Sequence, residues 1–278
     1  MKTKHKIGMI FLNLFFIFLC FICLIPILYA LTISLNAKND LLSSNFSFIP
    51  KSFTLQNYWE ILVNRPFLLW AKNSLILSAS TVVIDLTVAI PGAYVLSRKR
   101  FSGRKAILNL LILLNAFPAI RSMFAVYRIL KPVGLINTFT GLVLIYIGTM
   151  AIFALWNMKS YFDTIPLEIE EAAMMDGADD KQLIWRMVLP LARPSIIVTA
   201  VMILIYVWNE YIFAVTFING ADKYTLAAGL YSLQATDYTR NWPLFSAASL
   251  LVSLPVLIIF FCVQKYMVSG LTAGGVKG

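Results

Sequence analysis

Residues 195–217 read SIIVTAVMILIYVWNEYIFAVTF, an almost unbroken apolar stretch in which Glu210 is the only charged side chain. A helix of about 20 such residues is long enough to cross the hydrocarbon core of a bilayer. Other stretches of this kind occupy residues 10–34, 68–96, 106–127, 138–156 and 244–266. The sequence therefore predicts an all-α, polytopic membrane protein with six transmembrane helices. Pro118 and Arg121 interrupt the predicted third span near its end.

The composition also indicates a membrane protein. Of the 278 residues, 60% are hydrophobic and 13% are charged, whereas a soluble protein is about half apolar and a quarter charged. The net charge of +10 does not indicate nucleic-acid binding, because the basic residues are spread through short stretches between apolar spans. The cysteines lie in apolar stretches and the single histidine is His5, so no metal site is predicted.

The basic residues also predict the orientation of the chain. Short cytoplasmic loops of membrane proteins carry an excess of Lys and Arg. The densest basic cluster lies between the predicted second and third spans and comprises Arg98, Lys99, Arg100, Arg104 and Lys105. This cluster places both termini in the cytoplasm. Residues 1–66 then hold the first span and an outer loop, and residues 67–278 hold the remaining transmembrane core.

The predicted second and fifth spans contain the charged residues Lys72, Asp85 and Glu210. Lys72 lies close enough to a span end for its ammonium group to reach the interface. Asp85 and Glu210 lie deeper, where charges are costly and need a reason. Each could line a polar translocation path, latch two helices together or form a paired charge at a subunit interface, and we favour the last interpretation.

The cytoplasmic loop at residues 158–195 is too long for a simple connector. Its helix start and stop signals predict a helix over residues 167–175, since Pro166 suits a first helical turn and Gly177 suits a left-handed C-cap. Asp179 or Asp180 can cap a second helix, which we expect Pro190 and Pro194 to end before the fifth span. On composition alone, a docking helix and an acidic solvated loop fit the first helix equally well.

The same loop carries a recognisable motif. The runs Glu171-Ala172-Ala173, Asp176-Gly177-Ala178 and Leu189-Pro190-Leu191, followed by Pro194, resemble the EAA motif of binding-protein-dependent ABC importer permeases. The motif matches in residue type, in spacing and in its place before the second-to-last span. Trp208-Asn209-Glu210 and the ending at residues 270–278 are similar to the carbohydrate branch, in particular to the smaller permease of maltose-type importers.

This resemblance implies a type I ABC importer permease fold in a prokaryotic cytoplasmic membrane. In that family the motif forms a helix that couples the permease to an ATPase. The implied coupling residues are Glu168, Glu171, Ala172, Ala173, Asp176, Gly177, Ala178 and Pro190. On composition alone, the tail at residues 269–278 has no helical pattern and is typical of a frayed terminus. The resemblance implies that Gly274, Gly275 and Lys277 contact the ATPase. Tyr206, Asn209, Glu210 and Tyr211 are candidates for the translocation lining.

The resemblance also implies a set of partners. These are a second, non-identical permease, two copies of a cytoplasmic ATPase, an extracytoplasmic solute-binding protein and the membrane lipid. The sequence contains no G-x-x-x-x-G-K-[ST] phosphate loop, so ATP and Mg are expected in the partner ATPase and this chain is not expected to be an enzyme. An oligosaccharide such as maltodextrin is the implied cargo. The alternatives are another solute on the same machinery, an ion-coupled secondary transporter or, last, a membrane-embedded enzyme.

Overall fold

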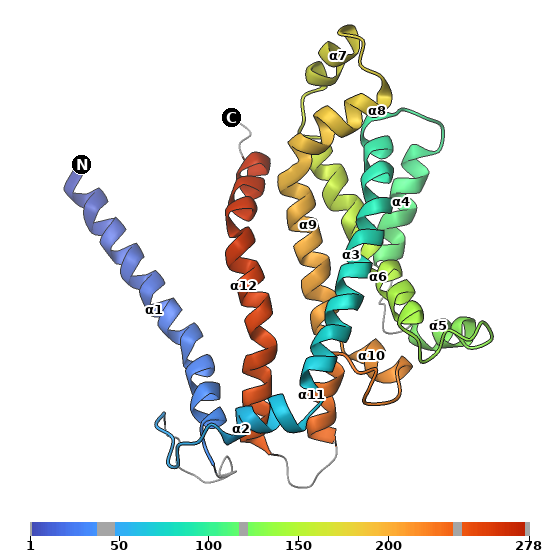
Figure 1. Ribbon diagram of the computed structural model, residues 1–278. Coiled ribbons are helices and arrows are strands. Elements are labelled where there is room, and N and C mark those ends of the chain that lie inside the picture. Colours follow the sequence, from blue (N-terminus) through green and yellow to red (C-terminus); the bar gives the residue numbers. More distant parts are fainter. Residues whose placement is uncertain (1, 38–47, 117–121, 236–240, 276–278) are drawn as a thin grey trace. The chain divides into compact units, whose positions relative to one another are not determined.

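The computed structural model describes residues 2–37, 48–116, 122–235 and 241–275, in which helices dominate and no strand is found beyond one isolated bridge between Asn36 and Phe53. The helices in chain order are α1 (Lys2–Ser34), α2 (Gln56–Trp59), η1 (Glu60–Asn64), α3 (Phe67–Arg98), α4 (Arg104–Asn115), α5 (Met123–Leu130), α6 (Phe139–Phe162), α7 (Leu167–Met175), α8 (Asp180–Gln182), η3 (Leu183–Val188), α9 (Leu189–Asn209), α10 (Ile212–Phe217), α11 (Leu226–Ala235) and α12 (Trp242–Gly275) (Figure 1). The elements η1 and η3 have the wider π-helical turn.

Five helices in the described part of the chain are long and apolar enough to cross a membrane, so the expected six are not confirmed. They cover Gly8–Ser34, Phe67–Arg98, Phe139–Phe162, Asp180–Asn209 and Trp242–Tyr266. The predicted third span, residues 106–127, is not one helix: α4 ends at Asn115 and α5 begins at Met123. At 12 residues, α4 rises only about 18 Å, well short of the roughly 30 Å hydrocarbon core. Pro118 and Arg121 lie outside the described residues.

The predicted fifth span is also shifted. Pro190 and Pro194 do not end the preceding helix, because α8, η3 and α9 run on without a break. Pro190 lies in the first turn of the α9 segment, directly after the wide turn of η3. The far end comes earlier than expected: α9 stops at Asn209, since Glu210 adopts an extended conformation and its carboxylate accepts the first N–H groups of α10.

The predicted non-helical tail is wrong as well, because α12 continues to Gly275. Extending an existing helix costs far less than nucleating one, so a long apolar helix can continue into small residues with weak helix propensity. Gly274 and Gly275 are therefore helical, whereas Lys277 lies outside the described residues.

The chain divides into two compact units. The first comprises residues 1–68 and 229–254. In it, the end of α1 is tied to the segment that follows: the Asn57 amide donates to the carbonyl oxygens of Ser34 and Asn36, both at 2.9 Å. The apolar side chains of α1 are largely exposed, as expected of a helix solvated by lipid.

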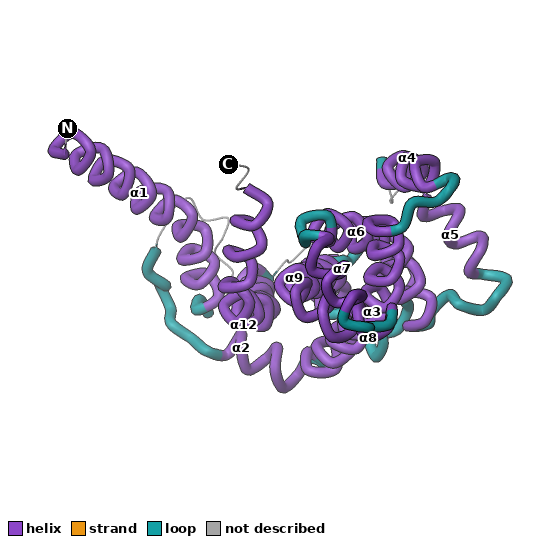
Figure 2. The backbone as a smooth tube through the Cα atoms, turned by 90° about the horizontal axis from the view of Figure 1, so that it is seen from above, coloured by secondary structure: helices purple, strands orange, loops and turns teal. Residues whose placement is uncertain are grey.

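The second unit comprises residues 69–228 and 255–278 and holds the loop with the recognised motif. Its core is formed by apolar side chains of α3, α6, α9 and α10, among them Leu77, Tyr146, Ile203 and Phe217. In Figure 1, α7 and α8 lie at one end of α3, α6 and α9, and α5 and α10 lie at the other end. Seen along the helices, α4 lies at the periphery of this unit (Figure 2).

Candidate functional site: the α7 loop and its anchor

The α7 helix forms where the sequence rules place it. It spans Leu167–Met175, and Glu168 and Glu170 lie in its first turn, where negative charge complements the helix dipole. The helix ends in a Schellman turn: the Gly177 amide donates to the Met174 carbonyl and the Ala178 amide to the Ala173 carbonyl, both at 3.0 Å. Gly177 sits at the left-handed position of this turn with φ +88°.

The next helix begins immediately after this turn. The Asp179 carboxylate accepts the Gln182 amide at 2.7 Å, which caps α8 at its N-terminus. The chain therefore reverses between α7 and α8 within a few residues. The predicted helix bounds, the left-handed glycine and the capping aspartate are all confirmed.

A buried ion pair anchors α7 to the end of α3. The Arg98 Nε donates to the Glu170 Oε1 at 2.7 Å, and the side chains of Arg98 and Glu170 are only 7% and 5% exposed. The Tyr94 hydroxyl donates to the other carboxylate oxygen of Glu170 at 3.0 Å. The remaining Arg98 nitrogens donate to the Ile165 carbonyl at 3.0 Å and to the Ser97 hydroxyl at 3.3 Å. Both charged groups are thus paired and hydrogen-bonded, as burial requires.

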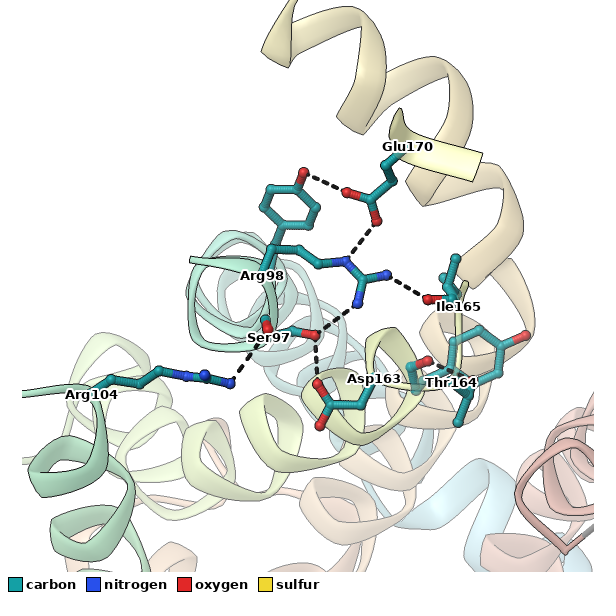
Figure 3. A network of polar contacts seen from close by, with 9 residues as sticks. Ser97, Arg98, Arg104, Asp163, Thr164, Ile165 and Glu170 are labelled. Carbon is teal, nitrogen blue, oxygen red and sulfur yellow. Dashed lines mark hydrogen bonds and ion pairs between the residues drawn. The ribbon is translucent and has the colours of Figure 1, made fainter. Parts of the chain in front are cut away.

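This network continues into α6. Figure 3 shows Arg98 between Glu170, Ile165 and Ser97, with Asp163 beyond them. The Ser97 hydroxyl donates to the Asp163 carboxylate at 2.6 Å, and the other oxygen of that carboxylate accepts Lys159 Nζ at 2.6 Å. The end of α3, the end of α6 and the start of α7 are therefore joined by one set of polar contacts, so a displacement of α7 is resisted by both longer helices.

Apolar packing fixes the inner face of α7. Ala173 is buried in a cluster with Phe162, Leu183 and Val188, which come from α6 and η3. Ala173 therefore has a packing role in this chain. The small side chain permits close approach of α7 to η3.

The outer face of α7 is exposed. Of the predicted coupling residues, Glu168, Glu171, Ala172, Asp176, Gly177 and Pro190 are exposed, Ala178 is half-buried and Ala173 is buried. Met175 is 88% exposed, and in η3 Trp185 is 72% exposed. Exposed apolar side chains of this size make the region a candidate interaction surface.

A groove runs beside this face. It has a volume of about 620 Å³ and is lined by residues of α7, α8 and η3, including Glu168, Ala172, Asp176 and Arg186. Most of the predicted coupling residues thus surround one hollow. The sequence reasoning missed Glu170 as an anchor. The signal for it was its spacing of three residues from Ala173, which places both on the inward face of a helix.

The predicted translocation residues lie on a different part of this unit. Tyr206 is half-buried against the core, Asn209 is exposed and its amide donates to the Ile205 carbonyl, and Tyr211 is 43% exposed. A cavity of about 650 Å³ in the same unit is lined by other side chains, including Asn115 and Thr149. A translocation role for these residues stays a prediction.

Glu210 acts as a latch between helices. Its carboxylate accepts the hydroxyl of the buried Tyr146 on α6 at 3.0 Å and the amides of Phe213 and Ala214 on α10 at 2.9 and 3.2 Å. Of the interpretations offered for this residue, the interhelix latch is the one that its contacts match. Asp85 differs: it is fully buried inside the chain, so the favoured interpretation as a charge at a subunit interface is wrong for it.

Replacing Glu210 with alanine is expected to lower the free energy of unfolding by about 2 kcal/mol, because it leaves a buried hydroxyl and two helix amides without an acceptor. Chemical unfolding of the detergent-solubilised protein measures this loss. Tyr146→Phe removes the hydroxyl alone and should cost about 1 kcal/mol. If the two substitutions together cost the sum of the single losses, Glu210 does not interact with Tyr146.

Known proteins resemble this chain over its whole length. The family model described as "Binding-protein-dependent transport system inner membrane component" matches residues 6–272. The galactooligosaccharides transport system permease protein GanQ of Bacillus subtilis (strain 168) is 34% identical over 100% of this chain and 99% of its own. The maltodextrin transport system permease protein MdxG of the same organism is 31% identical over 100% of this chain and 99% of its own.

A solved structure shares the fold. One chain of a bacterial ABC transporter involved in the import of the acidic polysaccharide alginate superimposes with a TM-score of 0.79 and 25% sequence identity. The match covers 96% of this chain and 98% of that chain. The two chains therefore have the same order of helices over nearly their full length.

Proposed function

The chain belongs to the family of binding-protein-dependent transport system inner membrane components, and on that premise we propose that it is the permease subunit of an ABC importer that carries an oligosaccharide across the inner membrane. The relatives described above transport galactooligosaccharides and maltodextrin according to their names. Neutral oligosaccharides are therefore the favoured cargo.

The α7 loop, which comprises residues 163–188 between α6 and α9, carries the mechanistic part of the proposal. It combines an exposed outer face beside a groove with an inner face held by a buried ion pair. A helix held in this way cannot yield locally when a partner pushes on it, so it passes the displacement to α3 and α6. We assign the outer face to the docking of a cytoplasmic ATPase, which binds ATP and Mg and whose closure tilts the membrane helices.

The remaining partners follow from the same proposal. Two ATPase copies need two docking helices, so a second, non-identical permease supplies the other one. An extracytoplasmic solute-binding protein delivers the sugar on the opposite side of the membrane. Gly274, Gly275 and Lys277 are proposed to approach the ATPase pair. ATP hydrolysis by the partner supplies the free energy of uptake.

Reconstituted vesicles test the cargo. The complete importer should take up galactooligosaccharides or maltodextrins from a solute panel only when ATP is enclosed with the ATPase. Amino acids and peptides serve as the matched negative solutes. Uptake of these solutes with no sugar uptake would replace the oligosaccharide assignment with the non-sugar alternative. Sugar uptake that needs no ATP but collapses with an ionophore would favour a secondary transporter.

A further inference from the structure

The short connection between α3 and α4 has basic side chains that no acidic residue balances. Residues 97–115 contain no Asp or Glu. Arg98 is committed to Glu170, and the Arg104 guanidinium donates to the Leu96 and Ser97 carbonyl oxygens at the end of α3. Lys99, Arg100 and Lys105 are exposed, and the described residues provide no carboxylate to pair with them. Solvent reaches these three charges, so they are accessible to an anionic ligand.

A pocket lies within this basic connection. Its volume is about 680 Å³, and it is lined by Arg100, Phe101, Gly103, Arg104, Lys105 and Ala106. Two of the uncompensated cations thus border the same hollow. Phe101 is 40% exposed and adds an apolar surface to its wall. The pocket is therefore suited to a small anionic group attached to an apolar body.

The helix α4 offers an exposed apolar surface next to this pocket, which the apolar part of such a ligand could contact. No residue of α4 is buried, and the helix exposes Ile107, Leu110, Ile112, Leu113 and Leu114 by 42–69%. This helix lies at the periphery of its unit (Figure 2). The basic pocket lies at the first turn of α4, and the exposed apolar side chains lie along the rest of the helix. The positively charged surface is therefore directly next to an apolar surface.

We propose that the basic pocket at the α3–α4 connection, together with the exposed face of α4, binds an anionic phospholipid. The phosphate of the head group lies among Arg100, Arg104 and Lys105, and the acyl chains run along α4. The position of the pocket at the end of a membrane-spanning helix puts it at the level of lipid head groups. Basic pockets at that level attract anionic lipids, and each Lys or Arg near the surface contributes measurably to the affinity.

Lipid titration of the purified importer complex tests this proposal. A fluorescent phosphatidylglycerol is expected to bind the unmodified complex, and the double variant Arg100→Gln/Lys105→Gln should bind it about 30-fold more weakly. Phosphatidylcholine, which carries no net charge, should bind weakly to both. The charge-preserving variant Arg100→Lys/Lys105→Arg should retain the affinity of the unmodified complex, which separates loss of charge from loss of fold.

The matched control removes two charges elsewhere. Arg128→Gln/Lys131→Gln at the end of α5 changes the net charge equally and should leave phosphatidylglycerol binding unchanged. If both double variants bound phosphatidylglycerol equally weakly, the assignment of the lipid to this pocket would be wrong, since the affinity would then depend only on net charge. Full displacement of the lipid by an equal concentration of glycerol phosphate would overturn the role of the α4 face. Unchanged binding in Arg100→Gln/Lys105→Gln would overturn the proposal outright.

Discussion

Glu170→Ala is expected to lower the free energy of unfolding by about 3–5 kcal/mol, because removing one partner of a buried ion pair leaves the other charge without compensation. Here the orphaned charge is Arg98, whose side chain is only 7% exposed. The Tyr94 hydroxyl loses its acceptor in the same substitution. Uptake should fall by at least about tenfold, since α7 is no longer fixed to α3. Unfolding in detergent and uptake in vesicles measure the two effects.

Two further variants distinguish anchoring from general damage. Arg98→Met with Glu170→Met replaces the pair by apolar side chains, which often restores stability; we expect stability to recover and ATP hydrolysis to stay poorly coupled to uptake. Arg65→Ala breaks the exposed pair with Glu60, in which Arg65 is 46% exposed, and should cost less than about 1 kcal/mol. A Glu170→Ala protein as stable and active as Arg65→Ala would refute the anchor.

Gly177→Val is expected to uncouple ATP hydrolysis from uptake while the protein remains in the membrane. Gly177 has φ +88°, and a Cβ built at this position meets nothing within 4 Å. The expected cost is therefore backbone strain of about 1–3 kcal/mol and not a steric clash. That strain distorts the turn that ends α7, so the docking face is presented in the wrong orientation. The ratio of sugar imported to ATP hydrolysed measures the coupling.

Gly177→Asn is the matched variant for this position. Asparagine tolerates the left-handed region better than other residues with a Cβ, so most of the coupling should be retained. Gly134→Val places similar strain at φ +70°, again in open space, but outside the α7 loop. It should leave coupling intact. If Gly134→Val lost coupling as well as Gly177→Val, backbone strain anywhere in the chain would be sufficient to uncouple ATP hydrolysis from uptake, and the α7 turn would have no special role.

Local rules were sufficient for the α7 loop. The bounds of α7, the left-handed Gly177 and the Asp179 cap all depend on residues within a few positions of one another, and such signals are readable from a single sequence. The apolar stretches likewise predicted most of the membrane-spanning helices. The three-residue spacing of Glu170 and Ala173 places both on one face of α7, and this spacing could have predicted which side of the helix is buried.

Features that depend on distant residues were not predictable in this way. Arg98 and Glu170 are separated by 72 positions, and the sequence around either residue does not identify the other as its partner. The break between α9 and α10 depends on the side chain of Glu210, whose contacts with Tyr146 span 64 positions. The helix also continues through Pro190, directly after the wide turn of η3, and the presence of a proline does not by itself tell a helix end from such a junction. The prediction of a third span was wrong because hydropathy alone cannot locate a break inside an apolar stretch.

Site-directed cross-linking tests the docking role of α7 most directly. In a background where Cys20, Cys23 and Cys262 are replaced by serine, Ala172→Cys on the exposed face of α7 is combined with a cysteine-reactive, photoactivatable cross-linker in the assembled importer. Val133→Cys, which follows α5 and is replaced at a side chain 63% exposed, is the control. If α7 docks on the ATPase, Ala172→Cys should give a covalent adduct with the ATPase and Val133→Cys should give none. No adduct from Ala172→Cys, or adducts of equal yield from both positions, would contradict the docking role.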